Sequence, residues 1–358
     1  MLLLLAGCST VPSDSEESVP QEWSATNAVS QPAMPVKKFS SRPAVKTIPA
    51  TTVRTNLPPP KIVPPAPILT WTSLDRWAAE NKLAAPRKVA SSPLASYAVN
   101  SPRGTLTLVI GSREAIWRGM EIHLGFAPEI IDDQVFIHGL DLQKNLEPLL
   151  LGTPLAFGTN RVIVIDPGHG GANPGAKCVL DNRYEKEFTL DWAKRLKPLL
   201  ETNGWKVILT RNNDVFFTNS LRAEFANAHQ ANLFISLHFN SLPDRAASGL
   251  EIFCLTPTGM PSTFTRGYSD LWTDHFPNNV FDIENFKLAV RLHAALLRAS
   301  GEEDRGVRRA RFMDVLHGAR CPAVLIEGGF LSNPREAEKI ESAEFRQKLA
   351  DAVANALK

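Results

Sequence analysis

The pattern of apolar and polar residues changes along the chain, and its most regular part begins at Arg161. From there, short apolar runs rich in β-branched residues alternate with segments whose apolar positions recur every three or four residues. The runs read as strands are RVIVID, WKVILTR, LFISLH, LEIFCL and AVLIEGG. The segments read as helices are EKEFTLDWAKRLKPLLETNG, TNSLRAEFANAHQA, ENFKLAVRLHAALLRASG and EFRQKLADAVANALK. This alternation predicts an α/β domain over residues 158–358, with a mostly parallel twisted sheet and helices on both faces.

A shorter and less regular pattern occupies residues 68–152. Ser73 precedes an amphipathic segment and suits the N-cap of a helix, because its hydroxyl can accept a free backbone N–H. Three strand-like runs follow, and the region closes with a helical segment; these are TLTLVIG, GMEIHLG, DQVFIHG and LDLQKNLEPLL. His123 and His138 lie inside the alternating runs, so we interpret them as ordinary core or surface residues. The pattern predicts a small α+β domain.

Residues 9–67 carry little apolar periodicity and are rich in Pro, Ser and Thr. Such a segment cannot bury enough apolar surface to fold, so we expect a disordered linker, extended where PPPKIVPPAP begins at Pro58. The whole chain has 358 residues, is 44% hydrophobic and carries a net charge of +2, which gives no basis for binding nucleic acid. Its apolar runs all fall short of the roughly 18 residues of a transmembrane helix.

The first ten residues, MLLLLAGCST, predict an attachment site for lipid. Leu5-Ala6-Gly7-Cys8 resembles the bacterial lipobox, in which a signal peptidase cuts before a cysteine that then carries lipid. The apolar run is shorter than a usual signal sequence and lacks a basic start, so we expect the natural start to lie upstream. The resemblance implies a protein anchored through Cys8 to a membrane and facing the periplasm. Ser9 favours the outer membrane.

Titratable residues follow three of the predicted strands. His169, His238 and Glu327 each come at or just after the carboxyl end of an apolar run, the edge at which open α/β sheets bind ligands. The glycine-rich loop around His169 fails as a phosphate loop, because Ala176 and Cys178 break the required G-K-[ST] ending. Two histidines and one carboxylate would instead suit a catalytic zinc. On pattern alone the third ligand is open between Asp166, Glu185 and Glu187.

Four motifs in this region together resemble one family. DPGHGG, EKEFTLDWAKRL, SLHFN and VLIEGGFLSNP occur in the order found in the zinc-dependent N-acetylmuramoyl-L-alanine amidases, and the resemblance covers about residues 161–358. It implies that His169, Glu185 and His238 bind Zn²⁺ and that Glu327 is the catalytic acid and base. Asn240 and Arg222 are candidates for substrate contact, although structural roles are equally compatible with the sequence. The 68–152 domain resembles the N-terminal domain of copper amine oxidases.

The family resemblance implies a cell-wall hydrolase. Its substrate would be peptidoglycan, and the bond cut would join N-acetylmuramic acid to L-alanine, during wall turnover or cell separation. Two alternatives remain: a zinc peptidase acting on wall peptides, which would use the same metal chemistry, and a wall-binding protein without activity, which would need a broken metal site. The segment of residues 256–283 is too short and too rich in proline for the helix that blocks the zinc in some family members.

Overall fold

The computed structural model describes residues 70–157 and 160–358 of the chain. The predicted lipid attachment at Cys8 and the predicted linker over residues 9–67 lie outside the described residues. Within the described part, no helix is both long and apolar enough to cross a membrane.

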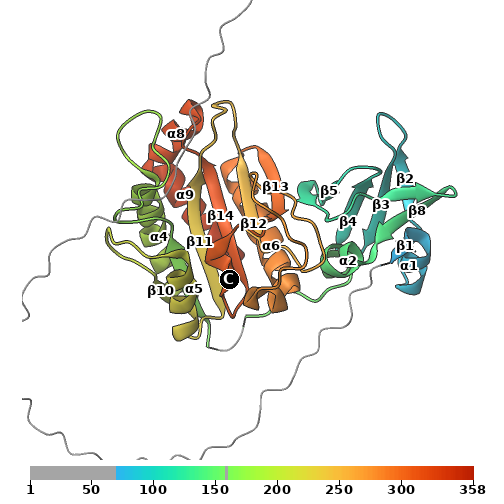
Figure 1. The fold of residues 1–358 in the computed structure, drawn as a ribbon, viewed down its shortest axis with the longest axis horizontal. Coiled ribbons are helices and arrows are strands. Elements are labelled where there is room, and N and C mark those ends of the chain that lie inside the picture. Colours follow the sequence, from blue (N-terminus) through green and yellow to red (C-terminus); the bar gives the residue numbers. More distant parts are fainter. Residues whose placement is uncertain (1–69, 158–159) are drawn as a thin grey trace, which may run out of the picture. The chain divides into compact units, whose positions relative to one another are not determined.

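The dominant feature is a mixed sheet of 11 strands in the order β10-β9-β11-β14-β12-β13-β6-β5-β4-β3-β2. Figure 1 shows β11, β14 and β12 side by side in it. The strands from the second half of the chain are β9 (Val162–Pro167), β10 (Lys206–Leu209), β11 (Leu233–Asn240), β12 (Leu250–Cys254), β13 (Asp304–Arg309) and β14 (Ala323–Phe330). Strands β10, β9, β11 and β14 are parallel neighbours, β12 runs antiparallel to β14, and β13 is parallel to β12. The predicted mostly parallel sheet is confirmed for this half.

Helices cover both faces of these strands. They are α4 (Glu185–Thr202), α5 (Asn219–Ala228), η2 (Pro277–Phe281), α6 (Asp282–Ser300), α7 (Asp314–His317), α8 (Pro334–Glu341) and α9 (Ala343–Ala356). Successive side chains of a strand point to opposite faces, so Ile163 and Ile165 share a core with α4, α6 and α9, whereas Val164 shares a core with α5 and α7. Every residue of β9 and β14 is buried, which is why both read as continuous apolar runs.

The first described region adds strands to the same sheet. Its elements are β1 (Trp71–Ser73), α1 (Leu74–Glu80), β2 (Arg87–Ala90), β3 (Ser96–Ser101), β4 (Gly104–Val109), β5 (Glu114–Trp117), β6 (Met120–His123), β7 (Glu129–Ile131), β8 (Gln134–His138), α2 (Gly139–Asp141), η1 (Leu142–Leu146) and α3 (Glu147–Leu150). Strands β2 to β6 form an antiparallel meander, and β6 pairs with β13 at Ile122 and Val307. Strands β1, β8 and β7 make a separate small sheet. The predicted cap is confirmed, since the Ser73 hydroxyl accepts the Arg76 N–H.

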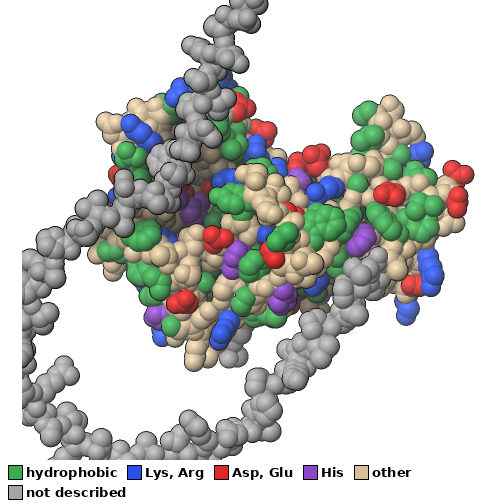
Figure 2. Space-filling model, viewed as in Figure 1, with side chains coloured by type: hydrophobic (Ala, Val, Ile, Leu, Met, Phe, Trp, Pro, Cys, Tyr) green, Lys and Arg blue, Asp and Glu red, His purple; other side chains and the backbone are tan. Residues whose placement is uncertain are grey.

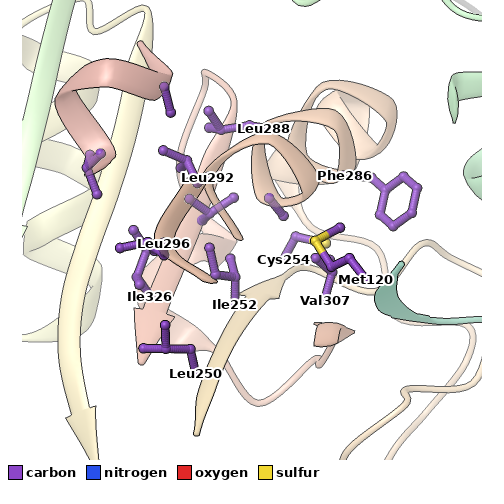
Figure 3. Packing of buried hydrophobic residues seen from close by; sticks show 14 of the residues in the cluster. Met120, Leu250, Ile252, Cys254, Phe286, Leu288, Leu292, Leu296, Val307 and Ile326 are labelled. Atoms are coloured by element: carbon purple, nitrogen blue, oxygen red, sulfur yellow. The ribbon is translucent and has the colours of Figure 1, made fainter. Parts of the chain in front are cut away.

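The core is continuous across the join between β6 and β13. Leu288 and Leu292 of α6 pack with Ile326 and Val307 from the sheet, and Met120 from β6 belongs to the same cluster (Figure 3). A backbone N–H of β6, that of Glu121, also donates to a carboxylate oxygen of Asp304 at 2.7 Å. The boundaries predicted for the two domains stay predictions, and the strands on either side of them belong to one sheet.

Several elements differ from the sequence prediction. Strands β1, β2, β3, β5 and β7 of the first region, and the short helices η2 and α7, were not predicted. Strand β13 and helix α8 were not predicted, because DRGVRR and PREAEKIE carry too few apolar residues for a periodic pattern. The single helix predicted at the end of the first region is instead the short helix α2, the π-helical turn η1 and the short helix α3 in succession. Cys178, Cys254 and Cys321 are buried free thiols.

Candidate metal centre and active site

Three adjacent strands bring the predicted site residues to one edge of the sheet. β9 leads into the loop that carries His169, β11 carries His238 near its end, and β14 carries Glu327. In the sheet register Glu327 lies beside His238 on one side and beside Glu251 of β12 on the other. The parallel direction of β9, β11 and β14 therefore places their carboxyl ends, and these side chains, together.

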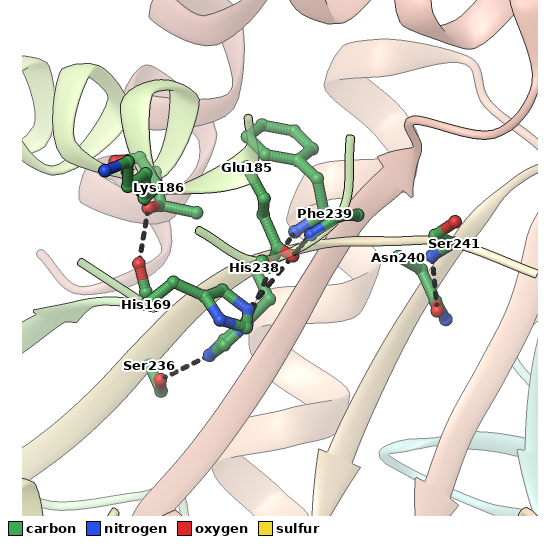
Figure 4. Close-up of polar contacts among 12 residues, drawn as sticks. His169, Glu185, Lys186, Ser236, His238, Phe239, Asn240 and Ser241 are labelled. Carbon is green, nitrogen blue, oxygen red and sulfur yellow. Dashed lines mark hydrogen bonds and ion pairs between the residues drawn. The ribbon is translucent and has the colours of Figure 1, made fainter. Parts of the chain in front are cut away.

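Glu185 joins the two histidines from the first position of α4. Its carboxylate oxygens lie 3.0 Å from His169 Nε2 and 2.8 Å from His238 Nδ1 (Figure 4). One ligand atom from each of the three residues can be chosen so that all lie within 4.8 Å of one another. The two imidazole rings meet edge to face, with their centroids 4.9 Å apart. These are the three residues whose ligand roles the sequence predicted.

The Glu185 carboxylate is held by the backbone around it. It accepts the N–H of Ala176 at 3.0 Å and the N–H of Phe239 at 3.1 Å, and the side chain is buried. Burial alone would raise the pKa of Glu185, but the hydrogen bonds and charges of His169 and His238 outweigh it and hold that pKa below its usual value. The carboxyl is therefore ionised, which is the form that binds a cation.

Each histidine makes a second contact that fixes its ring. His169 Nδ1 lies 2.9 Å from Asn173 Oδ1, and His238 Nε2 lies 3.1 Å from the Ser236 hydroxyl. That hydroxyl donates to Asp166 at 2.7 Å. Partners of this kind orient the rings of metal-ligating histidines. Asp166 therefore reaches His238 through the Ser236 hydroxyl, which fits a bracing role and not a place among the ligand atoms.

Two buried arginines hold the loop after β9 by its carbonyl oxygens. Arg211 donates to the carbonyls of Pro167 and Gly168, at 2.9 and 2.8 Å. Arg222 donates to the His169 carbonyl at 2.8 Å and forms an ion pair with Asp166 at 2.6 Å. The predicted substrate role of Arg222 stays a prediction; with 2% of its surface exposed, its observed contacts are those of a residue that supports the loop from beneath.

Glycine is required at two positions of this loop by close approach. A Cβ on Gly168 would lie 2.3 Å from the His238 ring. A Cβ on Gly175 would lie 2.6 Å from a Glu185 oxygen, and the residue also has a positive φ of 73°. A side chain at either position would displace one of the three predicted ligands.

Glu327 differs from its neighbours because one of its oxygens is unused. The side chain is 6% exposed, and its Oε2 atom is buried with no hydrogen-bond partner among the described residues. Burial, and then the negative charges of Glu185 and Glu251, raise the pKa of Glu327 well above its usual value, while Arg266 opposes them. An unpaired buried carboxyl of this kind is costly and is typical of functional sites.

Glu251 and Arg266, which were not predicted as site residues, lie near Glu327. Asn240, a predicted substrate contact, donates to Glu251 at 2.6 Å and accepts from Arg266 at 2.7 Å, so its polar atoms are engaged. Glu251 is 1% exposed and also pairs with Arg308 at 3.0 Å. A charged residue inside the apolar run LEIFCL was the available signal for Glu251. Arg266 comes from a turn-rich segment that gave no such signal, and the residue is exposed.

The residues fit the predicted metal. Two neutral imidazoles and one ionised carboxylate are the ligand set of many catalytic zinc sites, which keep a further position open for water or substrate. The edge of the sheet supplies this ligand set, with both histidine rings oriented by hydrogen bonds. Glu327, with its unpaired oxygen, lies on the strand next to the one that carries His238.

The second half of the chain matches a known protein family. The family model described as N-acetylmuramoyl-L-alanine amidase matches residues 163–358. The chain is 33% identical over 245 residues to the N-acetylmuramoyl-L-alanine amidase AmiC of Escherichia coli O6:H1, covering 61% of this chain and 58% of that protein's length. It is 32% identical over 218 residues to the amidase AmiA of Escherichia coli K12, covering 55% of this chain and 75% of that protein.

Among solved structures, the chain is similar to the catalytic domain of CwlV, an N-acetylmuramoyl-L-alanine amidase from Paenibacillus polymyxa. The identity is 28%, the TM-score is 0.46, and the alignment covers 55% of this chain and 96% of that one. The family match spans more than half of the chain and contains all four predicted site residues, His169, Glu185, His238 and Glu327. The enzyme class predicted from the sequence is thereby confirmed, and the chain belongs to the N-acetylmuramoyl-L-alanine amidase family.

Proposed function

We propose that this protein hydrolyses the amide bond between N-acetylmuramic acid and L-alanine in peptidoglycan, using Zn²⁺ held by His169, Glu185 and His238. The observation that carries the proposal is the meeting of those three side chains beside a buried Glu327 with an unpaired oxygen. Family membership supports the bond that is cut. Wall turnover or cell separation is the process we infer for it.

The roles follow from the positions of the side chains. When bound, zinc lowers the pKa of water and polarises a carbonyl. Glu327 accepts the proton of the attacking water and returns it to the departing alanine nitrogen, so that a lactyl carboxylate and a free amine result. The raised pKa of Glu327 suits this exchange, since a carboxyl that titrates nearer to neutral pH can both take and give a proton. Asn173 and the Asp166–Ser236 pair keep the two rings in place.

The test is to digest purified peptidoglycan with the zinc-loaded protein and to analyse the products by mass spectrometry. Stem peptides with a free N-terminal alanine are expected. Cleavage inside the stem peptide would favour the alternative of a zinc peptidase, and cleavage of the glycan would contradict both. An inactive protein that still binds peptidoglycan would favour a wall-binding role.

We also infer that Cys8 carries lipid and anchors the protein to the outer membrane, facing the periplasm. The support is the lipobox-like Leu5-Ala6-Gly7-Cys8 followed by Ser9. More than one acyl chain is needed for stable anchoring, and a lipoprotein cysteine carries several. The test is to fractionate cells that express the parent and Cys8→Ser. The parent should be in the outer membrane and the variant soluble; a soluble parent would contradict the anchor and leave the amidase proposal untouched.

A further inference from the structure

A second concentration of charge lies apart from the metal centre, where α6 faces the hairpins of the first described region. It surrounds a cavity of about 410 Å³, within the size range of small-ligand sites. Five cationic side chains and no acidic side chain line it, namely Arg103, Arg118, Lys287, Arg291 and Arg298. Trp117, Met120 and Val290 are among the apolar residues of the lining. The cavity shares no residue with the metal centre.

These cations are not neutralised within the described part of the chain, where none of the five forms an ion pair. Arg103 Nε instead donates to the Leu149 carbonyl at 3.1 Å. Arg291 donates to the carbonyls of Ala356 and Lys358, and its guanidinium lies over the ring of Phe157. Carbonyl acceptors hold a guanidinium in position without removing its charge. An arginine has five N–H groups, so donors remain for a ligand.

The third arginine of the cavity is positioned by packing. Gly104 has a φ of 146°, and a Cβ there would lie 2.6 Å from Arg118 Cγ and 3.2 Å from the Trp117 ring. The absence of a side chain at Gly104 lets the stem of Arg118 lie against the neighbouring hairpin, which reduces the freedom that the side chain would lose on binding a ligand. Arg103 and Arg291 are therefore held by carbonyl acceptors before any ligand arrives, and the stem of Arg118 lies close to Gly104.

The composition of the chain does not explain this cluster. The net charge is only +2, and on the face shown in Figure 2 side chains of both signs are interspersed. The helix dipole favours Arg298, which lies in the last turn of α6, but not Lys287 near the start of that helix or the two hairpin arginines. Five like charges around one cavity repel one another, and an anion would relieve that repulsion.

We propose that this cavity is a second peptidoglycan-binding site that takes carboxylate groups of the stem peptides, on a stretch of wall other than the one being cut. The inference rests on the proposed function, which makes a carboxylate-rich polymer the substrate. Arginine binds carboxylates through two parallel N–H···O bonds. A concave site with an apolar floor suits a peptide group that can enter it, whereas a flat membrane surface would require a protruding patch. Holding the polymer at two sites raises the effective concentration of scissile bonds at the metal centre.

The test compares two double variants of the full chain, each made in a Glu327→Gln background so that the polymer is not digested during binding. Arg118→Glu with Arg298→Glu changes two exposed cavity residues whose side chains make no hydrogen bond or ion pair within the described residues. Arg87→Glu with Lys88→Glu is the matched control, because these β2 residues are also exposed, change the charge equally and lie outside the cavity lining. Binding is measured by co-sedimentation with purified peptidoglycan, and thermal unfolding checks that all variants fold.

We expect the cavity variant to bind native peptidoglycan about tenfold or more weakly, and the control to bind within about twofold of the parent. Peptidoglycan whose carboxyl groups have been converted to amides should bind the parent as weakly as native peptidoglycan binds the cavity variant. With Glu327 restored, the cavity variant should cleave a small soluble muramoyl peptide at the parental rate and insoluble peptidoglycan more slowly.

Equal binding by parent and cavity variant would overturn the proposal, as would unchanged binding after amidation. Binding of the parent to phosphatidylglycerol vesicles but not to peptidoglycan, lost in the cavity variant, would also overturn it, because the ligand would then be a phosphate-bearing membrane. The binding experiments require no turnover. A protein that binds peptidoglycan through these residues yet releases no stem peptide would contradict the proposed function and leave this site intact.

Discussion

Asp141 in the first region and Glu327 in the candidate metal centre are both buried carboxyls, but they differ in their hydrogen bonds. Asp141 is fully buried, and its two oxygens accept from the N–H groups of Gly125 and Phe126 and from Asn145, at 2.6 to 2.8 Å. Glu327 is nearly as buried, yet one oxygen has no partner among the described residues. Burial raises the pKa of both.

This difference distinguishes a carboxyl with a structural role from one with a proposed catalytic role. A carboxyl whose oxygens are all satisfied ties segments together, here the turn after β6 to α2 and η1. A buried carboxyl oxygen without a hydrogen-bond partner costs free energy in the folded protein. That cost is offset only when a substrate or a proton binds to the free oxygen.

Loss of the metal should have the largest effect. His169→Ala, Glu185→Ala or His238→Ala removes one of three ligands, so we expect loss of bound zinc and of activity down to background. Metal content by mass spectrometry and turnover of a muramoyl peptide measure both. Glu187→Ala is the matched control, because this exposed residue of the same helix turn only accepts the Tyr184 N–H and should retain both. Full zinc in any of the three variants would contradict its ligand role.

Glu327→Gln should lower kcat by about 10²- to 10⁴-fold, the usual contribution of acid–base catalysis, while zinc content stays unchanged. The stability of the variant should not fall, because the neutral Gln replaces a buried carboxyl whose pKa is raised by burial and which is therefore more stable in its neutral form. Kinetics, metal analysis and urea unfolding check the three expectations. A variant that loses its zinc would show that Glu327 is a ligand, and the assigned roles would then be wrong.

Stability should depend on pH through Asp141. Burial is the main cause that raises its pKa from 3.8 to about 6, against the opposing hydrogen bonds from Gly125, Phe126 and Asn145. Between about pH 4 and pH 6 the unfolded chain releases this proton while the folded chain keeps it. The contribution of Asp141 to the free energy of unfolding should therefore fall as pH rises, by about 3 kcal/mol at most. Urea unfolding of the parent and of Asp141→Asn from pH 4 to pH 7 measures it, and parallel curves would contradict it.

Asp141→Ala should cost about 1–3 kcal/mol at neutral pH, because three donors, two of them buried, lose their acceptor. The activity of the remaining folded protein should be unchanged, in contrast to Glu327→Gln. Equilibrium unfolding and specific activity distinguish the two effects. A stable but inactive Asp141→Ala variant would erase the distinction between the two carboxyls.

The smallest effect is expected from Arg266→Gln. Because Arg266 lowers the pKa of Glu327, its loss should raise that pKa further, and the acidic limb of the pH profile of kcat/KM should move to higher pH. The direction of this shift in the pH profile is measured against Arg335→Gln, a control change at an exposed arginine on α8. A shift to lower pH would show that Arg266 acts on another group.

The sequence revealed those parts of the protein whose signals are local. Strands β9 and β14 are buried on both faces and read as unbroken apolar runs, and the predicted metal ligands follow recognisable motifs. Strand β13 was missed because Val307 is the only large apolar residue in DRGVRR. Its charged residues are stabilised by Glu251 and His293, which are distant in sequence. The contact of Arg266 with Asn240 likewise joins positions 26 apart, and no local pattern encodes it.

The charged sequence of β13 has a consequence for the part of the sheet that lies within the family match. If the strands before residue 157 were removed, β13 would become the edge of the remaining sheet. Charged edge strands resist pairing with other molecules, so the family-matched part carries its own protection against aggregation. The part of the chain from residue 160 onward would therefore not need the meander of β2 to β6 to protect its edge.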